Sequence, residues 1–201
     1  MPARTSRSCK RRVSRAIRVE TFRRVMQRVL VLGSPGSGKS TFAHRLAAAA
    51  AIPLVSLDAL YWKAGWTPSD TATFKSRVKD AAMNERWIMD GNYISHAGEF
   101  RRDRADTVVW FDLPRHVCML GILSRIAKGY GRVRPEMAAG CPEQFDLEFL
   151  RYVWTFRKEQ RPALIAYLDK RRADQQLLRF TERAEANSYL AGKEAASAGL
   201  H

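Results

Sequence analysis

The amino-acid sequence predicts an α/β domain with a five-stranded parallel sheet that is covered by helices on both faces. Two observations predict this fold class. Short apolar runs rich in β-branched residues, typical of buried parallel strands, alternate along the chain with segments of helical periodicity. Four predicted strands end at Gly33, Asp58, Asp90 and Asp112, and ligands bind beyond such strand ends in parallel sheets. The length of 201 residues suits a single domain.

The first three strands are predicted from short apolar runs that end at a glycine or an aspartate. They lie at 27–33, 54–57 and 87–89. A helix is predicted at 39–51, where alanines are frequent and the larger apolar residues share one face. A second helix is predicted from Thr67 to about Asn84, because Thr67 and Pro68 supply an N-cap and a first-turn proline.

The second half of the chain is predicted to add two strands and three helices. The strands lie at 107–111 and 176–180, and the helices lie at 115–128, from about 143 onward, and at 182–190. The middle helix has an apolar stripe that is more typical of a core face than of a ligand site: Phe145, Phe149, Tyr152, Val153 and Phe156. Residues 192–201 are rich in Ala, Gly and Ser and are predicted to form a flexible tail.

Residues 1–25 form a strongly basic extension. They contain nine Lys or Arg residues against one acid, Glu20, and contribute +8 to the net charge of +15. Three interpretations stay open: a disordered arm that binds nucleic acid or an acidic membrane surface, an organellar presequence, or residues added by a start assigned too early. The third is favoured, because Met26 stands directly before the first strand. The folded domain is therefore predicted to span 26–191.

Cysteine usage and hydropathy bear on the location of the protein. Cys9, Cys118 and Cys141 are odd in number and far apart, so they match neither a disulfide framework nor a metal-ligand spacing. No apolar run approaches the roughly 18 residues that suggest a membrane span. We therefore expect reduced thiols in a cytoplasmic protein without a membrane span.

A phosphate-binding loop is the strongest functional signal in the sequence. Residues 33–40 match the pattern G-x-x-x-x-G-K-[ST] in full, between a predicted strand and a predicted helix. Glycines let backbone N–H groups wrap a polyphosphate closely, and the following helix presents its unpaired N–H groups to the same anion. Lys39 is predicted to contact the β- and γ-phosphates, and Ser40 to coordinate Mg²⁺. The predicted nucleotide-binding residues are Gly33, Ser34, Pro35, Gly36, Ser37, Gly38, Lys39, Ser40 and Thr41.

Two absences favour phosphoryl transfer over energy-transducing hydrolysis. Many ATP-driven motors place a glutamate directly after the aspartate that ends a strand, whereas Asp58, Asp90 and Asp112 precede Ala, Gly and Leu. The sequence also has no Asn-Lys-x-Asp segment of the kind that reads guanine, so ATP is favoured over GTP. The predicted cofactors are ATP and Mg²⁺.

A mobile lid is predicted at about 129–142, a segment rich in Gly, Arg and Pro. Its glycines are candidate hinges, and Arg132 and Arg134 are candidate charge donors, with Arg125 as a third. A kinase needs such a lid to exclude water and to neutralise charge at the transferring phosphate. A solvated basic loop is the alternative.

From Met26 onward the chain resembles the adenylate-kinase-like P-loop NTPases of the DNA topology modulation protein (FlaR-related) family. The matching segments are Gly33–Thr41, Leu57–Trp62, Gly65–Trp66, Trp87–Tyr93, Arg104–Thr107, Phe111–Arg115, Arg134–Pro142 and Phe145–Phe149. They cover most of 26–190. The resemblance implies a three-layer fold like that of nucleoside monophosphate kinases, with a short lid and a nucleotide-dependent kinase activity.

Similarity to nucleoside monophosphate kinases and shikimate-type kinases implies roles for residues near the strand ends. Asp58 is the candidate that orients the acceptor hydroxyl or accepts its proton, with a loop-capping role as the alternative. Asp90 is expected to hold a Mg²⁺-bound water, which makes Ser40 and Asp90 the metal-site residues. Asp90, Asn92 and Arg101 are expected to contact the acceptor, and Arg101 its phosphate if it has one. The sequence Asn92-Tyr93 replaces the Phe-Pro-Arg of adenylate kinases, which argues against AMP as the acceptor.

The same similarity implies that Arg125 stacks on the base or reaches a phosphate and that Arg132 closes over the γ-phosphate. Four aromatic residues crowd the predicted acceptor side, where they either sandwich a planar substrate or pack under a loop: Tyr61, Trp62, Trp66 and Tyr93. Three further cationic residues either face the cleft or lie on a solvated helix face: Arg157, Lys158 and Arg161.

The leading hypothesis is an ATP- and Mg²⁺-dependent small-molecule kinase, with Lys39, Asp58, Arg125 and Arg132 as catalytic residues. A nucleotide or nucleoside acceptor is favoured over a polyol. One alternative is a nucleotide-regulated nucleic-acid-binding protein that affects DNA topology, with residues 1–25 on the nucleic acid. Another is a slow ATPase that acts as a switch. The core carries no recognisable nucleic-acid-reading motif, so the kinase ranks first. A monomer and a homodimer are both compatible with the sequence.

Overall fold

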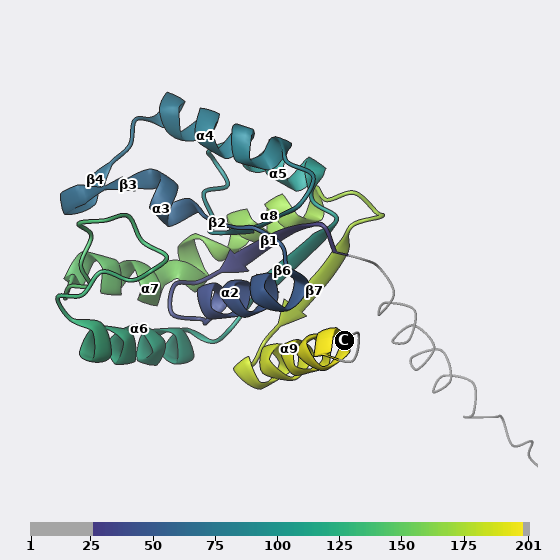
Figure 1. Cartoon of the computed structure of the whole chain (residues 1–201). Helices are drawn as coiled ribbons and strands as arrows, with labels where there is room; N and C mark the ends of the chain where they lie inside the picture. Colours follow the sequence, from purple (N-terminus) through teal and green to yellow (C-terminus); the bar gives the residue numbers. More distant parts are fainter. Residues whose placement is uncertain (1–25, 199–201) are drawn as a thin grey trace, which may run out of the picture.

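The computed structural model describes residues 26–198 and confirms the predicted fold class (Figure 1). Five strands form one sheet in the order β2-β5-β1-β6-β7, and every neighbouring pair is parallel. The strands are β1 (Arg28–Gly33), β2 (Leu54–Ser56), β5 (Trp87–Asp90), β6 (Thr107–Phe111) and β7 (Gln176–Phe180). The basic extension 1–25 and the roles predicted for it lie outside the described residues.

Helices cover both faces of the sheet and complete three layers (Figure 1). One face is covered by α2 (Lys39–Ala50), α6 (Arg115–Gly129), α7 (Leu147–Glu159) and α9 (Arg183–Ala198). The other face is covered by α4 (Thr71–Met83), α5 (Gly98–Arg104) and α8 (Arg161–Asp169). Within residues 26–198, none of these helices combines the length and the apolar character that a membrane crossing requires.

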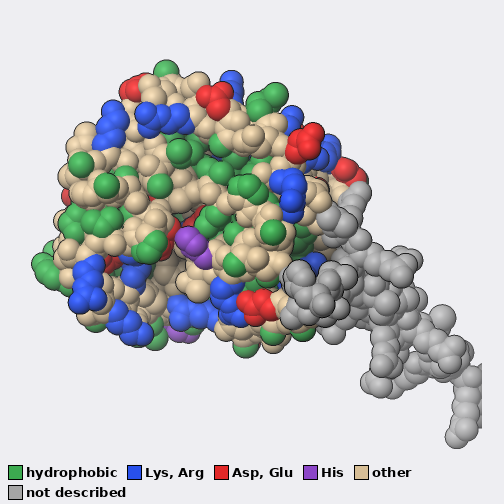
Figure 2. Space-filling view, viewed as in Figure 1, with side chains coloured by type: hydrophobic (Ala, Val, Ile, Leu, Met, Phe, Trp, Pro, Cys, Tyr) green, Lys and Arg blue, Asp and Glu red, His purple; other side chains and the backbone are tan. Residues whose placement is uncertain are grey.

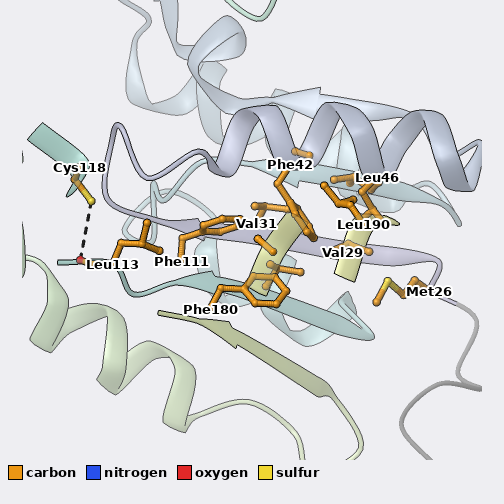
Figure 3. Packing of buried hydrophobic residues seen from close by; sticks show 14 of the residues in the cluster. Met26, Val29, Val31, Phe42, Leu46, Phe111, Leu113, Cys118, Phe180 and Leu190 are labelled. Atoms are coloured by element: carbon orange, nitrogen blue, oxygen red, sulfur yellow. Dashed lines mark hydrogen bonds between the residues drawn. The ribbon is translucent and has the colours of Figure 1, made fainter. Parts of the chain in front are cut away.

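Strand β1 shows why the sheet is buried on both sides. Its side chains alternate, so Val29 and Val31 enter one core while Leu30 and Leu32 enter the other, and all four are fully buried. Figure 3 shows the first core, where Phe42 of α2 packs over this strand. Because both faces of β1 are apolar, the central strand is held in place from both sides and carries the phosphate loop at its end.

Parallel pairing brings the carboxyl ends of the strands to one edge of the sheet. Asp90 ends β5 opposite Val31 of β1, and Gly33 ends β1 itself. Asp58 differs from the prediction, because β2 stops at Ser56 and Asp58 lies in the first turn of the short helix α3 (Leu57–Tyr61). Ser56 caps this helix through its side chain. The helix still places Asp58 at the edge where the other strands end.

The helix predicted from Thr67 begins instead at Thr71. Thr67 and Pro68 form β4 (Thr67–Pro68), which pairs with β3 (Trp62–Lys63) across the short helix η2 (Ala64–Trp66). Asp70 is the N-cap of α4, and its carboxylate accepts a hydrogen bond from the backbone N of Thr73 at 2.9 Å. Thr67 and Asp70 are both suitable caps, and the strand pairing of Thr67 leaves the role to Asp70.

The structure differs from the predicted helices at four further points. Helix α7 begins at Leu147 rather than near 143, because Asp146 caps it and accepts from the backbone N of Glu148 at 2.9 Å. Helix α8 was not predicted, because it follows α7 after the single residue Gln160 and the two apolar patterns merge. The short α5, rich in arginine, was also not predicted. Helix α9 runs on to Ala198, so most of the segment expected to be a flexible tail is helical.

The two cysteines within the described residues are buried and form no disulfide. The Cys118 thiol faces the carbonyl oxygen of Leu113 at 4.0 Å (Figure 3), and burial raises the pKa of Cys118. The Cys141 thiol donates to the carbonyl oxygen of Lys63. Both cysteines are thus free thiols, as the sequence predicts, whereas Cys9 lies outside the described residues.

Candidate functional site

A cavity of about 1330 Å³ opens at the carboxyl edge of the sheet. The phosphate loop and the start of α2 form one side, and α3 with the β3–β4 hairpin forms a second. Helix α7 and the segment 130–146 before it close a third side. Figure 2 shows a hollow on this face of the molecule, with acidic side chains near it. Small-molecule pockets usually measure about 300–1,000 Å³, so this cavity has room for two ligands at once.

The phosphate loop wraps one end of the cavity. Residues 35–41 line it, whereas Gly33 and Ser34 are buried beneath. Gly36 and Gly38 have φ angles of 73° and 100°, a left-handed region that glycine adopts at little cost. Gly38 is also the N-cap of α2 and supplies no capping side chain. The first-turn N–H groups of α2 are therefore available to an anion.

Two side chains from residues distant in the sequence hold the loop in this shape. The Asn92 amide accepts from the backbone N of Gly33 at 2.9 Å and donates to the Gly33 carbonyl oxygen at 3.0 Å. Asn92 also lines the cavity, and its predicted contact with an acceptor stays a prediction. Arg183, the first residue of α9, donates from Nη2 to the Gly36 carbonyl oxygen at 2.7 Å. Sequence reasoning missed Arg183, because 147 residues separate it from Gly36.

The loop also packs against α6 through two glycines. A Cβ added at Gly121 would stand 2.2 Å from the carbonyl oxygen of Gly36. We expect Gly121→Ala to displace the loop, to lower the free energy of unfolding by about 1–3 kcal/mol and to weaken ATP binding by about tenfold or more. Urea unfolding and calorimetric titration with ATP measure the two effects. Gly192→Ala is the control, because a Cβ there meets nothing within 4 Å, and equal behaviour of the two variants would contradict the expectation.

Asp90 lies at the end of β5 beside the start of α2. Burial raises the pKa of its carboxyl, while the Lys39 charge and the Ser40 hydroxyl act in the opposite direction. Its Oδ1 is buried and has no hydrogen-bond partner among the described residues. A buried carboxylate oxygen left open beside a hydroxyl fits Mg²⁺, which needs few protein ligands where phosphates supply the others. Across residues 26–198, His, Cys, Asp and Glu form no group of three that could hold a metal by themselves.

Asp58 lines the cavity from the first turn of α3 and is held by a tyrosine. The Tyr93 hydroxyl donates to Asp58 Oδ1 at 2.8 Å. Burial and the negative charge of Asp58 raise the pKa of Tyr93 well above its ordinary value, so the phenol stays protonated and remains a donor. The backbone of Tyr93 has a φ of 32°, which is strained for a residue with a side chain. The strained turn fixes the orientation of Asp58.

Arg101 does not contact the cavity, which corrects its predicted role at an acceptor phosphate. Its side chain has no exposed surface, and burial lowers the pKa of its guanidinium. Nη2 donates to the carbonyl oxygens of Asn92 at 2.8 Å and Tyr93 at 3.2 Å. A guanidinium inside the fold needs such acceptors, and these carbonyls belong to the strained turn. Arg101 therefore positions the residues that in turn hold the phosphate loop and Asp58.

The lid region contributes Arg125 and Arg134 to the cavity, and not the predicted Arg132. Arg132 is exposed, and its backbone bonds to Gly129 and Glu143 turn the segment so that the side chain lies outside the cavity. Glu143 is buried and receives both other arginines: Arg125 Nη2 lies 2.8 Å from Oε1, and Arg134 Nε lies 2.9 Å from Oε2. Sequence reasoning missed Glu143, although it lies just after the predicted lid.

The segment 130–146 rests on the β3–β4 hairpin. The backbone N of Gly65 donates to the Gly140 carbonyl oxygen at 2.8 Å, and the indole N–H of Trp66 donates to the Pro142 carbonyl oxygen at 3.1 Å. These bonds join the two loops that border the cavity on opposite sides. The predicted lid is thus in contact with the far rim in this structure.

The four aromatic residues predicted on the acceptor side all line the cavity: Tyr61, Trp62, Trp66 and Tyr93. They also pack on one another, with ring centroids 5.0 Å apart for Tyr61 and Trp62 and 5.6 Å apart for Trp62 and Trp66. The rings therefore pack under the rim and also present part of their surface to the cavity, and stacking on a planar substrate stays a prediction.

Asp90 does not line the cavity, and the strand-end carboxylate Asp112 does not line it either. Asp112 is buried and accepts from Arg161 Nε at 2.7 Å and Nη2 at 2.8 Å, with Arg179 on its other side. Arg157 lies 4.0 Å away. Arg157 and Arg161 therefore serve a structural cluster with Asp112 and do not line the cavity, and Lys158 is exposed. These contacts decide the open question about the three cations.

The pairing of Asp112 with Arg161 and Arg179 predicts how the stability of the fold depends on pH. Burial by itself raises the pKa of Asp112, but hydrogen bonds from Arg161 and Arg179 outweigh it and hold the pKa below its ordinary value. A carboxyl with a lowered pKa in the folded state stabilises the fold above its unfolded pKa of about 3.9 and loses this contribution as the pH falls below that value.

We expect Asp112→Asn to lower the free energy of unfolding by about 2 kcal/mol at pH 7. Below about pH 4, the free energies of unfolding of the variant and the wild type should become more similar. Urea unfolding from pH 3 to 7 measures both. Asp103→Asn is the matched control, because Asp103 also pairs with an arginine, Arg102, at 3.0 Å but is largely exposed. Its expected effect is under about 1 kcal/mol. A constant difference across the pH range for Asp112→Asn would contradict the assignment.

Comparison with known proteins supports the fold. No protein-family model and no curated protein sequence matches the chain. Among solved structures, a gluconokinase from Sinorhizobium meliloti 1021 is 17% identical, with 89% of this chain and 95% of that one covered and a TM-score of 0.51. A shikimate kinase from Bacteroides thetaiotaomicron is 16% identical, with 85% of this chain and 98% of that one covered and a TM-score of 0.51. The chain therefore shares the α/β fold of these two kinases.

Proposed function

We propose that the protein is a kinase that transfers the γ-phosphoryl group of ATP, with Mg²⁺, to a hydroxyl group of a small molecule. One observation carries the proposal. The phosphate loop and Asp58 border the same cavity, whose volume of about 1330 Å³ accommodates a nucleotide and an acceptor together. The fold shared with a gluconokinase and a shikimate kinase supports it further, because both are named for transfer to small molecules.

The phosphate loop binds and orients the triphosphate in this proposal. Residues 36–41 line the cavity, and their backbone N–H groups with the Lys39 ammonium would hold the phosphates. Ser40 and Asp90 would hold Mg²⁺, which would supply positive charge to the phosphates. The buried position of Asp90 keeps competing water away from its open oxygen.

Asp58 prepares the acceptor. Its carboxylate accepts the hydroxyl proton while the acceptor oxygen forms a bond to the γ-phosphorus, and the bond from that phosphorus to the β–γ bridging oxygen breaks. ADP leaves with the bridging oxygen, and the phosphorylated acceptor remains. Tyr93 holds one carboxylate oxygen of Asp58 at 2.8 Å, which leaves the other free for the hydroxyl. Arg125 and Arg134 border the same space, where both are paired with Glu143.

The resemblance to adenylate-kinase-like proteins of the DNA topology modulation family stays a prediction from the sequence motifs. It agrees with the proposal in activity class, since it also implies a nucleotide-dependent kinase. An adenylate-kinase-like activity is a more specific proposal. It is weakened because Asn92 and Tyr93 stand where adenylate kinases have Phe-Pro-Arg.

Incubation with γ-³²P-ATP, Mg²⁺ and pooled metabolites tests the proposed function. We expect label to appear in an organic product and to depend on both Mg²⁺ and the acceptor pool. Release of labelled inorganic phosphate alone, at a rate that no pool changes, would instead support the slow ATPase. Calorimetry with ATP and Mg²⁺ in the same preparation establishes that the protein is active in nucleotide binding.

A further inference from the structure

We propose that the acceptor is an uncharged alcohol that carries a ring, as nucleosides and sugars do, and that Glu143 excludes anionic acceptors. The proposal rests on the kinase function proposed above and narrows its substrate class. It follows from the balance of charge around the part of the cavity that faces Asp58.

The cations on the lid side of the cavity are already neutralised. Arg125 and Arg134 lie within 2.9 Å of the two carboxylate oxygens of Glu143, and Arg134 also lies 3.0 Å from Glu136. Glu143 is only 4% exposed. If either arginine turned to an anionic acceptor, a buried carboxylate would lose a partner, which is strongly unfavourable. These two arginines are therefore poor receptors for a carboxylate or phosphate on the acceptor.

Helices α7 and α8 supply no replacement. Of their arginines, Arg157 and Arg161 turn to Asp112, outside the cavity, and Arg151 is exposed and does not line it. The residues of this region that do line the cavity are uncharged, as Phe156, Gln160 and Leu164 show. A helix that faces a cavity with apolar and amide groups accepts an uncharged ligand more readily than an anion.

The other cationic side chains that line the cavity, among residues 26–198, serve different partners. Lys39 and Arg183 belong to the phosphate loop, and Arg45 pairs with Glu194 at 2.9 Å. His96 packs edge-on against Phe74, at a centroid distance of 5.6 Å, and is hydrogen-bonded to Ser95. Among residues 26–198, no lysine or arginine that lines the cavity is thus left over for a charged group of the acceptor.

The acceptor side itself combines negative charge with aromatic surface. Asp58 faces the hydroxyl in the proposed reaction, and its carboxylate repels an anion at short range. Tyr61, Trp62 and Trp66 present ring surface to the same space. Flat or ring-shaped uncharged molecules gain most from such a wall, because they lose little hydration on burial and stack on the rings.

Binding of the triphosphate does not alter this conclusion. The triphosphate faces the phosphate loop, where Lys39 and the first-turn N–H groups of α2 receive it. Arg125 and Arg134 therefore keep their pairing with Glu143.

Matched acceptor pools test the proposal. One pool holds uncharged nucleosides and sugars, and the other holds their anionic counterparts, the nucleoside 5′-monophosphates and the aldonic acids. With γ-³²P-ATP and Mg²⁺ we expect label in products of the uncharged pool, with kcat/KM about tenfold or more above that of the anionic counterpart. Assays of the single compounds then separate nucleoside from sugar.

The outcomes distinguish the two proposals. Label that enters the anionic pool preferentially overturns the inference about charge and leaves the kinase function intact. Release of inorganic phosphate with no labelled product in either pool overturns the kinase function, and the inference falls with it.

Glu143→Gln tests the residue that neutralises the arginines. Removing its charge frees Arg125 and Arg134 for an anion, so we expect the ratio of kcat/KM for the uncharged to the anionic member of a pair to fall about tenfold. A purely structural role would lower both values equally and leave the ratio unchanged, which would overturn the role of Glu143. Glu159→Gln, at the exposed end of α7, is the control and should retain the wild-type ratio.

Discussion

Lys39→Met is expected to lower the rate of phosphoryl transfer by about 10²- to 10³-fold, equivalent to about 3–4 kcal/mol of transition-state stabilisation. Methionine keeps the aliphatic stem but removes the ammonium group. Lys39 is the first residue of α2 and lines the cavity, so the loss falls on the charge that faces the β- and γ-phosphates. Single-turnover transfer from γ-³²P-ATP measures the effect.

The fold is expected to tolerate this change. Lys39 is partly exposed and lies outside the two cores, so the free energy of unfolding should change by less than about 0.5 kcal/mol. Lys75→Met on the exposed side of α4 is the matched control and should keep the wild-type rate. If Lys39→Met also kept that rate, the nucleotide would have to bind elsewhere.

Sequence patterns predicted those parts of the fold whose conformation depends on residues close together in the chain. The phosphate loop is encoded by adjacent residues whose glycines and helix start have one compatible geometry, so residues 33–41 could be assigned from the sequence. The alternation of strands and helices predicted the parallel sheet. The hairpin at 62–68 could not be predicted, because its strands are only two residues long and contacts of Gly65 and Trp66 with the segment 130–146 support it.

The wrong predictions for Arg101 and Arg132 have one cause, because the sequence does not show the direction in which a side chain points. Arg101 was assigned to an acceptor by similarity to nucleoside monophosphate kinases, but inside the fold its guanidinium donates to carbonyl groups of the turn after β5. Arg132 and Arg134 are two residues apart, and the sequence does not tell which of them enters the cavity. The pairing of Arg134 with Glu143 and Glu136 decides it. Such long-range partners leave no local signal in a single sequence.

The other large effect is expected at Asp58, where Asp58→Asn should lower kcat by about 10²- to 10⁴-fold. Asparagine has nearly the shape of aspartate and still offers a carbonyl oxygen to the Tyr93 hydroxyl, which lies 2.8 Å from Oδ1. The strained turn at Tyr93 and the packing around α3 should therefore persist. What is lost is the ability to accept the acceptor proton. ATP binding, measured by calorimetry, should change little, because Asp58 lies outside the phosphate loop.

The rate of the Asp58 variant separates proton transfer from positioning. If Asp58 accepts the proton, the amide cannot replace the carboxylate and kcat falls by the full factor. If Asp58 only orients the hydroxyl, the amide preserves much of the rate. Asp80→Asn, on an exposed turn of α4, should match the wild type in rate. A variant at Asp58 that keeps the wild-type kcat would remove the proton acceptor from the mechanism, because Tyr93 stays protonated and can only donate.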